Sequence, residues 1–179
     1  STPSNSSAAS DVYKRQLYNK RSLNRYLEDV FEDCLLNEKE LGILFLDIDH
    51  FKQLNDRYGH GRGDEGICAV ADTLKKCFPE DYVARYGGDE FLVVMTGRDR
   101  EYAEEHARQL CMGIRECEIP NEDSSVEPWL TISVGGVCAI PKEPNRVWDF
   151  LSAADKTLYD QKNEQKGKVR FYVGEGQYL

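Results

Sequence analysis

The sequence lacks any apolar run approaching the roughly 18–20 residues that a membrane-spanning helix needs. Its first ten residues are uncharged and serine-rich, so they offer neither the basic start nor the apolar centre of a secretory signal. None of the six cysteines forms a C-x-x-C pair, which makes a zinc site unexpected. Most of them fall at apolar positions of helical patterns, where cysteine acts as a small hydrophobe. We expect a reduced, cytoplasmic protein, although a missing region could anchor the full-length protein to a membrane.

Basic side chains are also few, with 23 Lys and Arg against 32 Asp and Glu and a formal net charge of −9. That balance disfavours nucleic acid or an anionic membrane as partner, because both would be repelled. A phosphate-bearing substrate would need something to offset the carboxylates, for which a metal ion is the obvious candidate. The length of 179 residues suits one compact domain.

The chain divides into a tail and one domain. Residues 1–16 are predicted to be a disordered linker or a tail of foreign origin, and residues 17–179 the domain. Apolar spacing predicts helices within 20–36, 50–58, 64–78, 103–114 and 150–158, and strands within 41–49, 82–86, 91–95, 129–140 and 168–173. Residues 58–64 read as a Gly-rich loop and 119–128 as a surface loop. The alternation indicates an α/β fold, an α+β sandwich of helices on a mixed sheet with one β-hairpin.

Acidic residues stand in two unusual places. Asp47 and Asp49 end an apolar strand, and Asp89 and Glu90 follow a pair of glycines in the predicted hairpin turn. A carboxylate at the end of a buried run needs a partner or a metal. For Asp47, Asp89 and Glu90 we favour a divalent cation such as Mg²⁺ or Mn²⁺, the alternative being caps and turn formers. For Asp49 we favour an N-cap of the helix that follows.

The glycines of the hairpin turn, Gly87 and Gly88, have two compatible interpretations. They can supply positive φ for a tight turn. They can also let backbone amides approach a phosphate that any Cβ would obstruct.

Residues 85–91 read RYGGDEF, which resembles the signature of the GGDEF family, the diguanylate cyclases. Further blocks resemble this family in order: LDIDHFK at 46–52, NDRYGH at 55–60, GD at 63–64, TISVG at 131–135 and ADKTLY at 154–159. The resemblance covers roughly residues 17–173, and five ordered blocks are far more specific than one.

The resemblance implies a palm-like fold similar to that of polymerases and nucleotidyl cyclases. It implies condensation of two GTP into cyclic di-GMP with release of two pyrophosphates, by attack of each 3′-hydroxyl on the other α-phosphate across a homodimer. It also implies two Mg²⁺ or Mn²⁺ ions in each active site, and an upstream sensor domain in the full-length protein. Such chemistry depends on positioning and charge neutralisation.

The resemblance implies metal-binding and catalytic roles for the residues of this sequence that match the family's motifs. Asp47 occupies a position that resembles a side-chain metal ligand of the family, and Ile48 would bind the metal through its carbonyl. Asp89 would bind metal and help to remove the 3′-hydroxyl proton, and Glu90 would add a metal contact. Lys52 would neutralise phosphate charge, the alternative being a solvated lysine.

The resemblance also implies substrate-binding roles for matching residues. Asn55 and Asp64 resemble the guanine-reading pair, because a carboxylate accepts two parallel hydrogen bonds from the guanine edge. The alternative for Asp64 is the N-cap of the following helix. His60 would belong to the substrate loop, or be a turn residue, with no acid–base role. Lys162 and Lys166 resemble phosphate contacts, although the family usually has Arg where Lys166 stands.

Two departures from the family concern regulation. The family's product-inhibition motif is R-x-x-D, and here Phe78 replaces the arginine while Asp81 is kept, so feedback at that site is expected to be weak or absent. The opening motif, which couples the domain to a sensor, is recognisable only as LYNKR at 17–21. The alternatives to an active cyclase are a silent GTP or cyclic di-GMP binding module and an acidic interaction domain.

Overall fold

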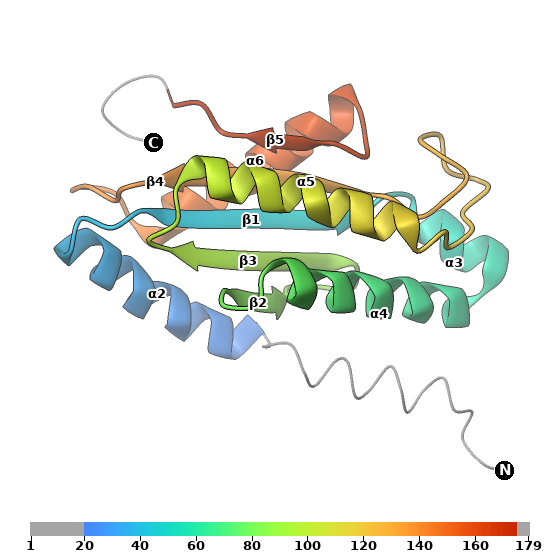
Figure 1. The fold of residues 1–179 in the computed structure, drawn as a ribbon, viewed down its shortest axis with the longest axis horizontal. Helices are drawn as coiled ribbons and strands as arrows, with labels where there is room; N and C mark the ends of the chain where they lie inside the picture. The colour runs from blue at the N-terminus through green and yellow to red at the C-terminus, as the bar shows by residue number, and fades with distance from the viewer. Residues whose placement is uncertain (1–19, 175–179) are drawn as a thin grey trace, which may run out of the picture.

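The computed structural model describes residues 20–174, which form a five-stranded mixed sheet covered by helices on both faces (Figure 1). The sheet has the order β2-β3-β1-β4-β5, with β4 and β5 parallel and the other pairs antiparallel. Its strands are β1 (Leu41–Ile48), β2 (Tyr82–Arg85), β3 (Glu90–Thr96), β4 (Ile132–Ala139) and β5 (Val169–Phe171). The predicted sandwich of helices on a mixed sheet is confirmed.

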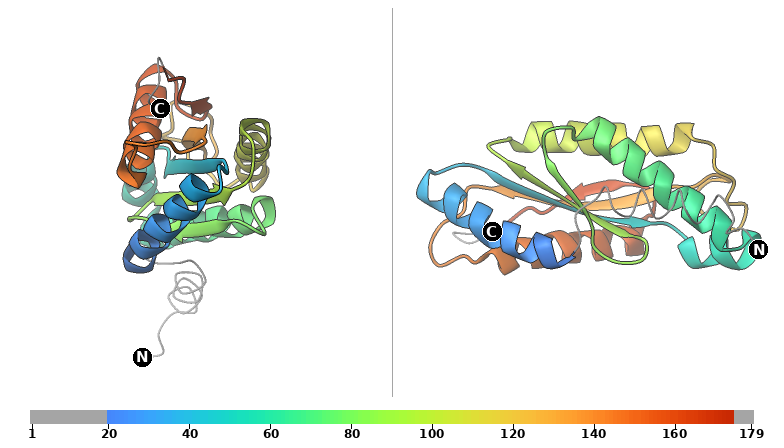
Figure 2. Two further views of the ribbon diagram at one scale, coloured as in Figure 1. Left: turned by 90° about the vertical axis from the view of Figure 1, so that its left-hand side faces the viewer. Right: turned by 90° about the horizontal axis from the view of Figure 1, so that it is seen from below.

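The helices divide between the two faces of the sheet. They are α2 (Lys20–Leu36), α3 (Phe51–Tyr58), α4 (His60–Cys77), α5 (Arg100–Glu116) and α6 (Val147–Glu164). Figure 2 shows α4 and α5 on one side of the sheet and α2 and α6 on the other. The structure therefore has two hydrophobic cores, one on each face of the sheet.

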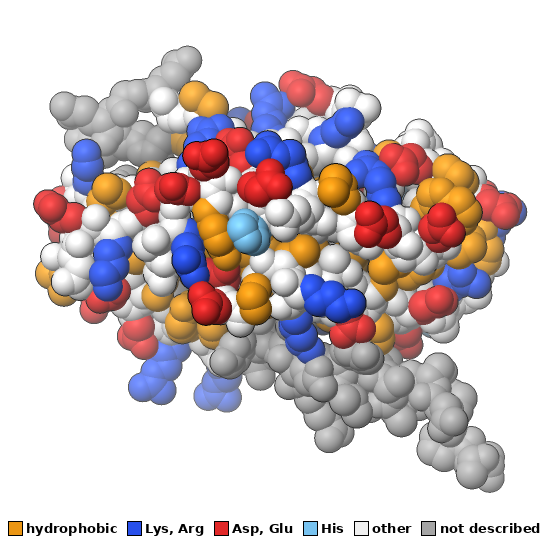
Figure 3. Space-filling view, viewed as in Figure 1, with side chains coloured by type: hydrophobic (Ala, Val, Ile, Leu, Met, Phe, Trp, Pro, Cys, Tyr) orange, Lys and Arg blue, Asp and Glu red, His pale blue; other side chains and the backbone are white. Residues whose placement is uncertain are grey.

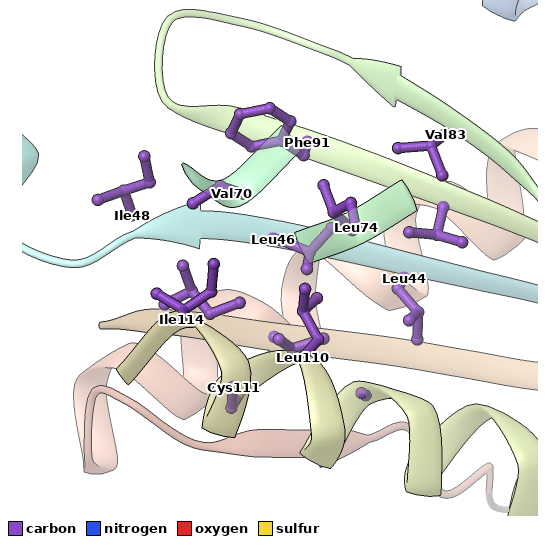
Figure 4. Close-up of a cluster of buried hydrophobic side chains, with 14 of the residues drawn as sticks. Leu44, Leu46, Ile48, Val70, Leu74, Val83, Phe91, Leu110, Cys111 and Ile114 are labelled. Atoms are coloured by element: carbon purple, nitrogen blue, oxygen red, sulfur yellow. The ribbon is translucent and has the colours of Figure 1, made fainter. Parts of the chain in front are cut away.

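Strand β1 supplies both cores because its side chains alternate. Leu44, Leu46 and Ile48 face α4 and α5, where Figure 4 shows them packed among side chains of those helices. Leu41, Ile43 and Phe45 belong to the core under α2 and α6. A strand apolar on both faces is typical of a sheet covered on both sides, which is why this strand was recognisable in the sequence.

The predicted β-hairpin is formed by β2 and β3, and β3 pairs with β1. This register places Glu90 directly opposite Asp47 at the end of β1. The glycine turn therefore projects beyond the sheet beside the last residues of its central strand.

Two local predictions were wrong. The loop expected at 58–64 is helical from His60, and only Gly59, at φ 83°, separates α3 from α4. Asp49 does not cap α3, because His50 occupies that position at φ 54° with no side-chain cap. Asp49 is instead fully buried, and it accepts hydrogen bonds from Thr131 Oγ1 at 2.7 Å and Ser133 Oγ at 2.6 Å.

Within residues 20–174, none of the helices is both long and apolar enough to cross a bilayer. The predicted tail, and most of the opening motif at 17–21, lie outside the described residues.

Candidate active site

Two carboxylates meet where β1 ends beside the glycine turn. The Ile48 N–H donates to the Asp89 carbonyl at 3.2 Å, which places Asp89 beside the end of β1 that carries Asp47. Burial, and next the charge of Asp47, raise the pKa of Asp89 from its ordinary 3.8 to about 6. The proximity inferred from the sequence is therefore present in the structure.

Glu90 lies on the same face of the sheet as Asp47, because opposed residues of an antiparallel pair point to one side. Burial first, and then the charges of Asp47 and Asp155, raise the pKa of Glu90. The Lys162 ammonium, from α6, lies 2.7 Å from a carboxylate oxygen of Asp47. The Asp47 side chain is only 14% exposed. This ion pair brings one predicted phosphate-binding residue into contact with a predicted metal ligand.

The donor set fits a hard divalent cation in part. Among residues 20–174, no group of three His, Cys, Asp or Glu side chains is arranged to hold a metal ion. The negative charges of Asp47 and Asp89 nevertheless repel each other, and a bound cation would relieve that repulsion. Ile48 is the last residue of β1, so its carbonyl belongs to the same strand end. Magnesium commonly takes one or two carboxylates and completes its coordination with water and substrate phosphates.

The turn itself is held by Arg85. Its Nε donates to the carbonyls of Gly87 and Gly88, both at 3.1 Å, and its Nη2 donates to Gly88 as well. The expected positive φ is absent at both glycines. A Cβ at Gly87 would lie 2.7 Å from a Glu90 carboxylate oxygen, so the Glu90 side chain would have to move to accommodate it. Nothing lies within 4 Å of a Cβ at Gly88, which leaves the outer side of the turn open.

The two residues predicted to read guanine lie close together. Asn55, on α3, packs against Gly63, where a Cβ would lie 1.9 Å from Asn55 Oδ1. Gly63 directly precedes Asp64, which lies inside α4 and so cannot be its N-cap. The Asn55 oxygen is buried and has no hydrogen-bond partner among the described residues. An unsatisfied buried acceptor beside Asp64 fits a recognition residue that lacks its ligand.

The remaining predicted residues are less tightly placed. Lys162 and Lys166 line one small cavity of about 290 Å³. Lys52, on α3, and His60, the first residue of α4, are both exposed. Neither makes an ion pair within the described part of the chain.

Sequence reasoning missed two structural supports of the site. The first is Arg85, whose charge also interacts with those of Asp64 and Asp89. Burial is the larger influence on it and lowers the pKa of its guanidinium. The second is the buried carboxylate of Asp49, which accepts a hydrogen bond from Ser133. The Ser133 hydroxyl in turn accepts one from the Gly167 N–H at 3.0 Å, so Asp49 is connected to the segment that follows α6. The polar Thr131 and Ser133 at the start of an otherwise apolar strand were the available signal.

Comparison with curated proteins gives relatives of similar sequence. The chain is 33% identical over 154 residues to the probable diguanylate cyclase DgcC of Escherichia coli, covering 86% of this chain and 40% of that protein. It is 33% identical over 133 residues to diguanylate cyclase A of Treponema denticola, covering 74% of this chain and 35% of that protein. The chain thus spans well under half the length of these relatives.

Solved structures share the fold. The GGDEF domain of DgcB from Caulobacter crescentus, in complex with c-di-GMP, superposes with a TM-score of 0.78 at 24% identity, over 87% of this chain and 91% of that one. The active GGEEF domain of a diguanylate cyclase from Vibrio cholerae gives a TM-score of 0.80 at 24% identity, over 89% and 99%.

The family described as "Diguanylate cyclase, GGDEF domain" matches residues 13–168, nearly the whole chain. That span contains the carboxylate pair, the glycine turn and the Lys162 ion pair. The chain therefore belongs to the GGDEF domain family.

Proposed function

We propose that this domain is an active diguanylate cyclase, which condenses two GTP molecules into cyclic di-GMP. The observation that carries the proposal is the convergence of Asp47 and Asp89 at the end of β1, where the Ile48 N–H donates to the Asp89 carbonyl and Lys162 lies 2.7 Å from Asp47. Two acids and a lysine beside an open glycine turn combine metal-binding oxygens with a cation for phosphate. A silent binding module has no need to retain this pair.

In the proposed reaction, the 3′-hydroxyl oxygen of one GTP forms a bond to the α-phosphorus of the other, and the bond to pyrophosphate breaks. The hydroxyl proton would go to Asp89, which lies beside the end of β1. The same exchange in the opposite direction closes the ring and releases the second pyrophosphate. Two Mg²⁺ or Mn²⁺ ions, held by Asp47, the Ile48 carbonyl, Asp89 and Glu90, would supply charge neutralisation.

Lysines would stabilise the phosphates. Lys162 and Lys166 line one cavity and would hold the triphosphate. Lys52 is exposed on α3 and is free to reach a bound phosphate. The open outer side of Gly88 would let the phosphates approach the backbone closely.

Guanine would be read by Asn55 and Asp64. The buried Asn55 oxygen without a partner supports this assignment. An adenine edge would leave the Asp64 carboxylate unpaired, which can give strong discrimination. His60, at the start of α4, would border the same substrate site.

Catalysis would require two GTP-loaded copies, since each site holds one of the two reacting nucleotides. We therefore propose a homodimer as the active form. The chain covers only part of its relatives, and we propose that an upstream sensor controls dimer formation in the full-length protein.

Product inhibition through the family's R-x-x-D site would be weak or absent. Phe78 is 1% exposed and packs in the core, so it presents no group to a ligand. Asp81 accepts a hydrogen bond from the Tyr102 hydroxyl at 3.1 Å. Phenylalanine cannot reproduce the planar fork by which arginine binds phosphate or guanine. Inhibition by low-micromolar cyclic di-GMP that disappears in Asp81→Ala would refute this proposal.

The test of function is incubation of the domain with GTP and Mg²⁺, with the nucleotides separated afterwards. We expect cyclic di-GMP, at a rate per protein that rises with protein concentration. Asp89→Ala and Lys52→Ala should abolish turnover, whereas Asp29→Ala, an exposed change on α2, should not. GTP binding without product would favour the silent module, and full activity in Asp89→Ala would overturn the site assignment. If the domain neither binds GTP nor turns it over, the acidic interaction domain would be favoured.

A further inference from the structure

We propose that the groove between α5 and β5 binds a small organic anion, a phosphate ester with a flat apolar body. The groove has a volume of about 550 Å³ and lies between the face of α5 that carries Arg100, Arg108 and Arg115 and the stretch from Gly167 to Phe171. That volume is within the range of small-molecule sites in proteins. Of the residues assigned to the active site above, none lines this groove.

The charge of the groove is opposite to that of the chain. Its lining contains five basic residues and one acidic residue, in a chain with a formal net charge of −9. Figure 3 shows Lys and Arg side chains gathered over the upper part of the molecule, where α5 and β5 lie, with Asp and Glu among them. A local reversal of sign favours an anion at this position.

Part of this positive charge is not neutralised. Glu104 pairs with Arg100 at 2.6 Å and with Arg108 at 3.5 Å, Glu105 also pairs with Arg108 at 3.6 Å, and Glu127 pairs with Arg115 at 2.8 Å. Lys168 is exposed and makes no ion pair with any described residue. Arg170, whose side chain is 41% exposed, pairs through Nη1 with Glu164 at 3.0 Å. The charge left without an ionic partner in the groove is therefore that of Lys168, as far as residues 20–174 show.

The floor of the groove is apolar and suits the body of such a ligand. Phe171 is 7% exposed, and the Arg100 guanidinium lies 5.5 Å from the centre of its ring. Cys111 is buried beside it, and burial raises the pKa of its thiol to about 12, so it contributes an apolar surface and no nucleophile. A flat apolar group can lie on this floor while its phosphate meets the arginines at the mouth.

A peptide strand added to the edge of β5 is a poorer occupant. Arg115 Nη2 donates to the Gly167 carbonyl at 2.8 Å, and Arg100 Nη1 donates to the Tyr172 carbonyl at 3.3 Å. These side chains cover backbone acceptors on both sides of the three-residue strand β5. Strand addition needs such acceptors to be free.

The test uses 1-naphthyl phosphate as the probe and follows backbone amides of the ¹⁵N-labelled domain without metal. We expect saturable shifts at residues 168–170, with a dissociation constant of about 1 mM or tighter. Naphthol, which lacks the charge, and inorganic phosphate, which lacks the ring, should each bind at least about tenfold more weakly.

A double variant, Arg108→Gln with Lys168→Gln, tests the charge and leaves the other three arginines of the groove in place. Both side chains lie at the surface, and we expect an unchanged melting temperature with binding weakened by about tenfold or more. Lys76→Gln, an exposed change on α4, should bind as the parent does. Three results would overturn the proposal: no saturation at residues 168–170, undiminished binding in the folded double variant, or shifts confined to Gly87 and Gly88. Shifts at the same amides caused by an oligoglutamate peptide alone would also overturn it, in favour of an acidic protein partner.

Discussion

Replacing Asp89 with asparagine should stabilise the metal-free domain at neutral and alkaline pH. Burial and Asp47 raise the pKa of Asp89 from 3.8 to about 6, so the folded protein holds this proton more tightly than the unfolded chain. The associated stability is fully present below pH about 4 and is lost as the pH rises through about 6. The shift corresponds to roughly 3 kcal/mol, which screening at a partly exposed group reduces to about 1–2 kcal/mol.

Thermal unfolding in the presence of a chelator measures this effect. Asp89→Asn should melt about 2–8 °C above the parent at pH 8 and close to it at pH 4. Added Mg²⁺ should raise the melting temperature of the parent and have little effect on the variant. Asp29→Asn makes the same charge change on the exposed surface of α2 and should leave the curve unaltered. A variant less stable than the parent at pH 8, or a difference independent of pH, would refute the like-charge reasoning.

Three further substitutions test other parts of the structure. Asp49→Ala removes a buried acceptor of two hydroxyl hydrogen bonds and should cost about 2–5 kcal/mol in urea unfolding, whereas a loss below about 1 kcal/mol would contradict its supporting role. Lys162→Met removes the counter-ion of Asp47, so in titration calorimetry Mn²⁺ alone should bind more tightly and the metal–GTP complex more weakly. If both affinities changed in the same direction, the result would argue against the role of the ion pair. Gly63→Ala pushes a Cβ into Asn55, so GTP should lose its advantage over ITP in binding, and an unchanged preference would remove Asn55 from guanine recognition.

The sheet was predictable because its signals are local. Apolar side chains on both faces of residues 41–48 require cover on both sides, and the glycine pair between two short apolar runs marks the hairpin. Helix α4 was harder, because Gly61 and Gly63 suggest a loop. Packing overrides that propensity, since Gly63 accommodates Asn55.

The site was predictable in its carboxylates and less so in its supports. Asp47 and Asp89 stand out because acids rarely end an apolar strand or follow two glycines in a turn. The position of Asp49 depends on hydroxyl groups more than 80 residues away, which no local pattern reveals. The bonds from Arg85 to the turn likewise depend on a side-chain conformation that the sequence does not specify.

The Lys162–Asp47 ion pair joins residues 115 positions apart, and this has a consequence for folding. Strand β1 is synthesised before its neighbour β4 and the helix α6, which follow the hairpin and α5 in the sequence. Contacts of such long separation form late, after most of the loop-closure entropy has been lost. During synthesis, the acids at the end of β1 and in the hairpin therefore exist without their lysine counter-ion until α6 has emerged and docked.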